Sequence, residues 1–111
     1  MSETETIVQF SGELDLSIKD ELHERLDALR SLPQVVLDFS NVTYFDSCCV
    51  VELMRLCKKR IESGLEPQKI ALSDGDAHLR RLLDICGVSK VCPIVRSADL
   101  TRGGADKLRS V

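Results

Sequence analysis

Apolar residues follow two different periods along this chain. Short apolar runs predict four buried strands, at residues 7–10, 35–38, 69–72 and 91–94. Between them, apolar positions recur every three or four residues, which predicts helices from Ser17 onward and over residues 47–63 and 77–85. A last, weak helix is predicted to begin at residues 97–100. Strands that alternate with helices indicate the α/β class, with helices packed against a mixed or parallel sheet, which we expect to be a mixed β-sheet of about four strands.

Length and charge exclude several classes of protein. At 111 residues the chain is expected to form a single domain over residues 1–111, with 43% hydrophobic and 30% charged residues. The formal net charge of −3 argues against direct binding to nucleic acid, which requires a basic surface. No apolar run is long enough to span a membrane, and the polar start lacks the features of a signal peptide. We therefore expect a cytoplasmic protein with no membrane span.

The five cysteines do not have the spacing of a zinc site or a disulfide framework. Cys57, Cys86 and Cys92 fall on apolar periodic positions and are expected to fill the core. Cys48 and Cys49 are adjacent and lie at a predicted helix N-terminus, a place that lowers thiol pKa. One alternative function is therefore a thiol redox sensor that uses Cys48 and Cys49.

Asp46 and Ser47 stand where the second predicted strand gives way to a helix. Asp is a favoured N-cap residue, because its carboxylate accepts from backbone N–H groups that the helix leaves unpaired. The pair often serves only as a cap. The same unpaired donors would also accommodate an anionic group on Ser47. Ser47 is therefore the best candidate for a modified hydroxyl.

Five segments, in this order, resemble the STAS family, the domain of bacterial anti-sigma factor antagonists and of sulfate transporter tails. The resemblance extends over about residues 7–108 and implies a single STAS-type domain with helices mainly on one face of the sheet. No single motif is decisive, but the series is specific. The segments are Ser11-Gly12-Glu13-Leu14-Asp15, residues 35–42, Phe45-Asp46-Ser47, residues 81–88 and Ile94.

The resemblance also implies a function. In these antagonists a partner anti-sigma factor, which is a serine kinase, phosphorylates the Ser that follows Asp; here that residue is Ser47. The unphosphorylated form would bind the anti-sigma factor and so release a sigma factor. In the family pattern Ser and Gly follow, whereas this chain has Cys48 and Cys49. The residues expected at the partner contact are Asp15, Asp46, Ser47, Cys48 and Cys49.

Other functions stay open at this stage. Stand-alone STAS domains also act as accessory subunits of lipid-transport or signalling complexes, and a weak homodimer is not excluded. A response regulator with Asp38 as phosphoacceptor ranks lowest, since an early acidic pair for magnesium is missing. His23 and His78 neighbour no plausible nucleophile in the sequence. We therefore expect a regulatory binding protein with no cofactor and no bound metal, not an enzyme.

Overall fold

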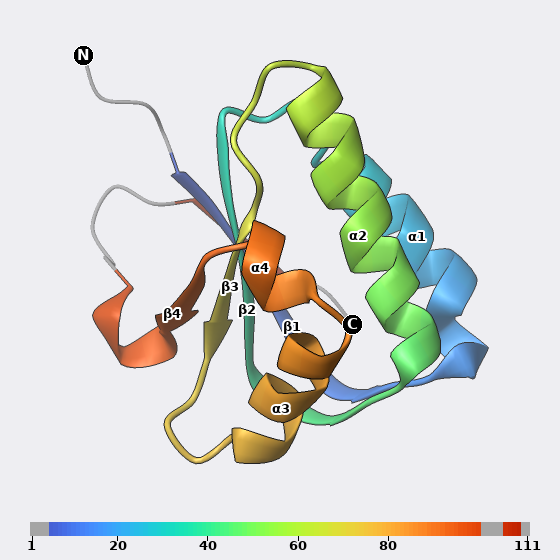
Figure 1. Ribbon diagram of the computed structural model, residues 1–111, viewed down its shortest axis with the longest axis vertical. Coiled ribbons are helices and arrows are strands. Elements are labelled where there is room, and N and C mark those ends of the chain that lie inside the picture. The colour runs from blue at the N-terminus through green and yellow to red at the C-terminus, as the bar shows by residue number, and fades with distance from the viewer. Residues whose placement is uncertain (1–4, 101–105, 110–111) are drawn as a thin grey trace.

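A computed structural model describes residues 5–100 and 106–109 (Figure 1). The strands form one sheet in the order β4-β3-β2-β1-β5, and each pair of neighbours is parallel. Parallel neighbours require crossover connections, which the helices provide in this chain. The strands are β1 (Glu5–Leu14), β2 (Gln34–Phe45), β3 (Lys69–Leu72), β4 (Ile94–Arg96) and β5 (Asp106–Arg109).

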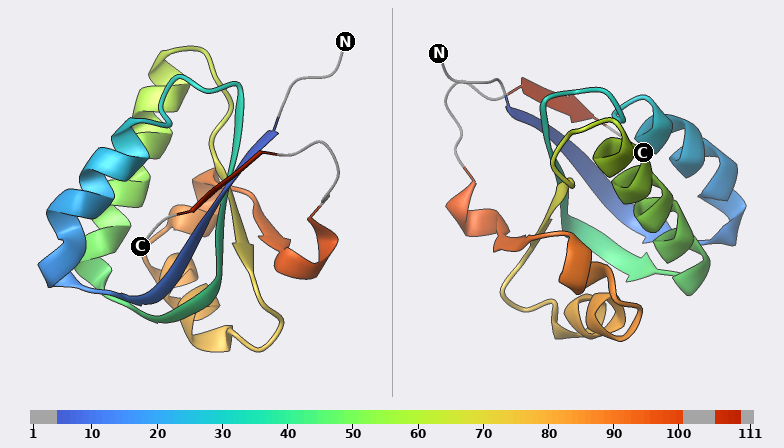
Figure 2. Two further views of the ribbon diagram at one scale, coloured as in Figure 1. Left: turned by 180° about the vertical axis from the view of Figure 1, so that it is seen from behind. Right: turned by 45° about the horizontal axis from the view of Figure 1, so that its top comes forward.

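The helices follow the strands in the alternation that the sequence predicts. They are η1 (Leu16–Ile18), α1 (Lys19–Asp27), α2 (Ser47–Glu62), α3 (Ala77–Ile85), α4 (Val88–Val91) and η2 (Ser97–Asp99). Helices α1 and α2 lie side by side, as both views in Figure 2 show. The α/β class is therefore confirmed.

The main core lies between the helices and one face of the sheet. Val35, Leu37 and Phe39 of β2 point into it and are at most 3% exposed. Leucines of α1, α2 and α3 join the same cluster, so these helices share one face. On the other face only a small cluster forms, around Val36 and its neighbours. Helices packed mainly on one face are thus confirmed.

Of the two kinds of sheet that the sequence left open, mixed or parallel, the structure has the parallel one, and it has one strand more than the expected four or so. Its described pairs are all parallel, and the fifth strand, β5, pairs with β1 in a region where we predicted the end of a weak helix. Of the helix expected to begin at residues 97–100, the described residues form the single turn η2, and the part over residues 101–105 lies outside the described residues. The residues of β5, Asp106–Arg109, form no apolar run, unlike those of the equally short β3, and the strand depends on pairing with a distant segment.

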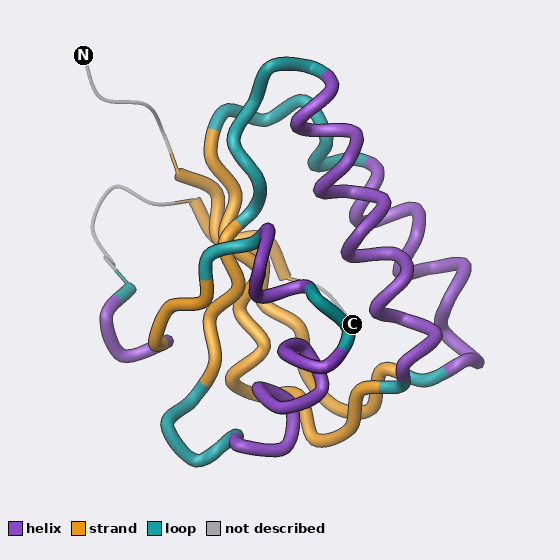
Figure 3. The backbone as a smooth tube through the Cα atoms, viewed as in Figure 1, coloured by secondary structure: helices purple, strands orange, loops and turns teal. Residues whose placement is uncertain are grey.

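Strands β1 and β2 continue well beyond their apolar runs. The polar residues Ser11 and Gly12 pair with Asn41 and Val42, with register shifts on either side of them. Backbone pairing does not need apolar side chains, so periodicity missed these extensions. The extensions bring Leu14 opposite Phe45, at the end of the sheet where the chain enters η1 and α2 (Figure 3).

One cysteine lies outside the core. Cys57 and Cys92 are buried as predicted, but Cys86 is exposed and forms the C-cap of α3. The prediction for Cys86 was wrong because the helix ends there. Gly87, at φ 83°, turns the chain into the short helix α4 before the expected strand begins.

Candidate functional site

Ser47 is the first residue of the 16-residue helix α2 and its side chain is exposed. Asp46 adopts an extended conformation and its Oδ1 accepts a hydrogen bond of 3.1 Å from the amide of Cys48. The same oxygen lies 3.5 Å from the hydroxyl of Ser47, which donates to it. The predicted N-cap, Asp46, is therefore confirmed, and its carboxylate holds the Ser47 hydroxyl at the N-terminus of α2.

Asp15 is also an N-cap residue, directly after the end of the neighbouring strand β1. It caps η1, because its Oδ1 accepts from the amide of Ser17 at 2.9 Å and also from the Ser17 hydroxyl. These two hydrogen bonds, that from the hydroxyl first, hold the pKa of Asp15 below its ordinary value of 3.8. We expected Ser17 to be the cap; it is instead the donor to Asp15, and α1 begins at Lys19.

Backbone bonds join these two capped turns. The amide of Asp46 donates to the carbonyl oxygen of Leu14 at 2.9 Å, and Leu14 pairs with Phe45 in the sheet. Asp15 therefore lies on the strand end next to the one that carries Asp46 and Ser47. Four of the five predicted contact residues, Asp15, Asp46, Ser47 and the half-buried Cys48, come together at accessible positions.

Cys49 is not available to a partner. Its side chain is 0% exposed, and burial, followed by the effect of neighbouring Cys48, raises the pKa of its thiol to about 12. The helix turns this residue, one of those expected at the partner contact, toward the core of the free protein. The redox alternative required a lowered thiol pKa at the helix N-terminus, and for Cys49 desolvation acts in the opposite direction.

Three exposed apolar side chains lie on the segments that meet at Ser47. Leu16 follows Asp15 and is 66% exposed, whereas Tyr44 at the end of β2 and Val51 of α2 are each 48% exposed. Val51 is one helical turn from Ser47, on the same side of α2. We call Leu16, Tyr44 and Val51 the apolar rim. The apolar periodicity of the sequence did not predict it, because a period does not tell which apolar residues of a segment stay exposed.

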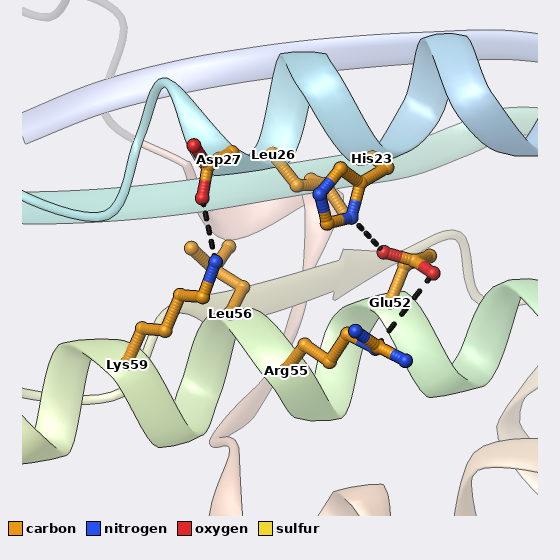
Figure 4. Close-up of a pocket in the computed structure, with 7 residues that line it drawn as sticks. All are labelled: His23, Leu26, Asp27, Glu52, Arg55, Leu56 and Lys59. Atoms are coloured by element: carbon orange, nitrogen blue, oxygen red, sulfur yellow. Dashed lines mark hydrogen bonds and ion pairs between the residues drawn. The ribbon is translucent and has the colours of Figure 1, made fainter.

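A second polar cluster lies between α1 and α2 (Figure 4). His23 is hydrogen-bonded through Nδ1 to Oε1 of the buried Glu52, and Lys59 reaches Asp27 at 2.8 Å. The cavity between these side chains measures about 10 Å³, which holds at most one water molecule. The cluster therefore ties the two helices together and offers no room for a ligand.

The described part of the chain contains no group of three or more His, Cys, Asp or Glu residues arranged to hold a metal ion. None of the described helices has the length and apolar character needed to cross a membrane.

The comparisons with known proteins agree with one another. A family model described as "Mlab, STAS domain" matches residues 1–96. An anti-sigma F factor antagonist of Paenibacillus polymyxa is 31% identical over 91 residues, a match that covers 79% of this chain and 75% of that protein. The solved structure of the anti-sigma factor antagonist SpoIIAA in its unphosphorylated form shares the fold, with a TM-score of 0.69 at 10% identity, over 88% of this chain and 85% of that one. This chain therefore belongs to the STAS domain family.

Proposed function

We propose that this protein is an anti-sigma factor antagonist that is switched by phosphorylation of Ser47. Its unphosphorylated form binds a serine-kinase anti-sigma factor in the cytoplasm and thereby releases a sigma factor. The observation that carries the proposal is the exposed Ser47 hydroxyl on the first turn of α2, beside the Asp46 cap. The likeness to an anti-sigma F factor antagonist supports the choice of partner.

The apolar rim gives the partner a surface to bind. Leu16, Tyr44 and Val51 lie on the same chain segments as Asp15, Asp46 and Ser47, and a surface with both exposed apolar and polar groups suits a protein partner. Covering a half-exposed side chain of this size contributes about 1 kcal/mol. The rim therefore supplies affinity, and the polar residues supply discrimination between the two states of Ser47.

Electrostatics explains how a phosphate would break the contact. A phosphate on Ser47 adds about −1.5 to −2 charges next to the carboxylate of Asp46 and close to that of Asp15. In a partly exposed setting this repulsion, with the cost of desolvating the phosphate, amounts to roughly 1–3 kcal/mol, or a tenfold to hundredfold loss of affinity. In the free protein the dipole of α2 offsets part of the repulsion, so the fold can survive the modification.

The test is a pull-down with the intact protein, Ser47→Ala and Ser47→Asp, followed by identification of the bound proteins and phosphosite mapping after incubation with ATP. Ser63→Ala is the matched control, because Ser63 is an exposed serine at the opposite end of α2. We expect an anti-sigma factor bound to intact protein and to Ser47→Ala, and phosphate on Ser47 alone. Phosphate on another residue, or a partner that binds Ser47→Asp equally well, would overturn the switch. The second result would favour an accessory subunit of a lipid-transport or signalling complex.

A further inference from the structure

The Cys49 thiol lies where the end of β1 meets the first turn of α2. Its Sγ is 3.4 Å from the carbonyl oxygen of Leu14 and 3.8 Å from that of Asp15, both within the reach of a weak S–H donor. The side chain is 0% exposed and packs in the main core together with Leu14 and Phe45. The thiol therefore contacts two successive carbonyls of the segment that carries Asp15.

The hydrogen bonds of Asp15 with Ser17 and Ile18 stay within its own turn. The carboxylate of Asp15 accepts from Ser17, and its carbonyl oxygen accepts from the amide of Ile18 at 3.1 Å, so these bonds stay within the segment itself. The link from the Asp46 amide to Leu14 is a bond between backbone atoms alone. Cys49 adds a side-chain contact to this link. The glycine that the family pattern has at this position could make no such contact.

We propose that Cys49 is a positioning residue, which fixes the place of Asp15 relative to Ser47 through its contacts with the Leu14 and Asp15 carbonyls. This inference rests on the proposed function, in which one partner reads both residues together. Cys49 itself touches no partner, because it is buried. It determines how well the Asp15 carboxylate is aligned when the kinase binds, and so acts on recognition rather than on the transfer of the phosphoryl group.

Amide hydrogen exchange of the free, full-length protein tests the positioning without any partner. In Cys49→Ala we expect the amides of Asp46 and Ile18 to exchange about tenfold faster, relative to the amide of Ile70 in β3 as a reference for global opening. Cys49→Ser keeps a donor and should fall nearer to the wild type. Cys57→Ala is the matched control, since it removes another buried thiol from α2 away from the site. Unchanged exchange at Asp46 and Ile18 in Cys49→Ala would overturn the proposal.

Steady-state phosphorylation then tests the consequence for recognition. With the cognate anti-sigma factor, defined by pull-down, and ATP, Cys49→Ala should raise KM for this protein about tenfold and leave kcat within about twofold. Cys57→Ala should change neither constant. Equal KM for Cys49→Ala and wild type, with altered exchange, would overturn the role in recognition. If no kinase modifies Ser47, the proposed function fails, whereas the exchange experiment still decides whether Cys49 positions Asp15.

Discussion

The amide of Asp46 donates a 2.9 Å hydrogen bond to the carbonyl oxygen of Leu14, although the two residues are 32 positions apart in the sequence. The bond joins the end of β1 to the residue that caps α2. Because of it, the capped turn at Asp15 and the capped turn at Asp46 stand next to each other. A partner that approaches Ser47 therefore meets both carboxylates.

Ser47→Asp should weaken binding of the anti-sigma factor by tenfold to hundredfold, because it places a negative charge at the contact, although a carboxylate carries less charge than a phosphate. Ser47→Ala should bind like the wild type and accept no phosphate. Titration calorimetry measures both affinities. Ser63→Asp, which adds the same charge at the far end of α2, serves as the control and should bind normally. Equal affinities for Ser47→Asp and Ser47→Ala would contradict the electrostatic mechanism.

Local signals in the sequence predicted the N-cap at Asp46. The features that the sequence analysis missed depend on contacts between residues far apart in the chain. Asp46 and Ser47 could be placed because an N-cap depends on neighbouring residues. The burial of Cys49 depends on Leu14, 35 positions earlier. Arg60 is a charged residue that is 0% exposed, and the sequence did not predict its burial, because its carbonyl partners come from loops that the periodic pattern does not describe.

Asp15 should lose its stabilising effect in acid. Its folded-state pKa is lowered by Ser17, so its contribution is complete above the ordinary value of 3.8 and is lost as the pH falls through the folded pKa. We expect NMR titration of the Asp15 carboxyl to show this lowered pKa, and Ser17→Ala to move it back toward 3.8.

Asp15→Ala should impair phosphorylation and binding more than folding. A variant that unfolds readily but is phosphorylated normally would give Asp15 a structural role.

Cys49→Gly restores the residue of the family pattern, and on that pattern alone the change should be tolerated. The burial of Cys49 indicates a larger cost. Glycine in a helix costs about 1 kcal/mol, and the lost packing adds about 1–2 kcal/mol, so we expect a loss of about 2–3 kcal/mol in the free energy of unfolding. Urea denaturation measures it. Cys86→Gly, at the exposed C-cap of α3, is the control and should cost clearly less.

Arg60 should be among the most sensitive positions for stability. Its guanidinium donates to four carbonyl oxygens in the connections that follow α1 and α2, at 2.7 to 3.1 Å. Arg60→Met would leave these buried acceptors without their donor, and we expect a loss of about 3–5 kcal/mol in the free energy of unfolding. Lys58→Met, on the exposed side of the same helix, should change it by less than about 0.5 kcal/mol. Similar urea midpoints for the two variants would show that the Arg60 bonds contribute little.

The apolar rim should contribute to binding and not to folding. Leu16 is 66% exposed and Val51 is 48% exposed, so truncation of either to alanine removes little that the folded protein buries. In the complex these side chains would be covered, and each alanine variant should lower affinity about fivefold to tenfold, equivalent to about 1 kcal/mol. Ile85→Ala is the matched control, because Ile85 is 72% exposed on α3 and outside the rim. Calorimetric titration with the anti-sigma factor, beside a urea curve for each variant, separates the two effects. If Leu16→Ala and Val51→Ala bind as tightly as Ile85→Ala, the partner docks elsewhere, and the surface around Ser47 serves only the kinase reaction.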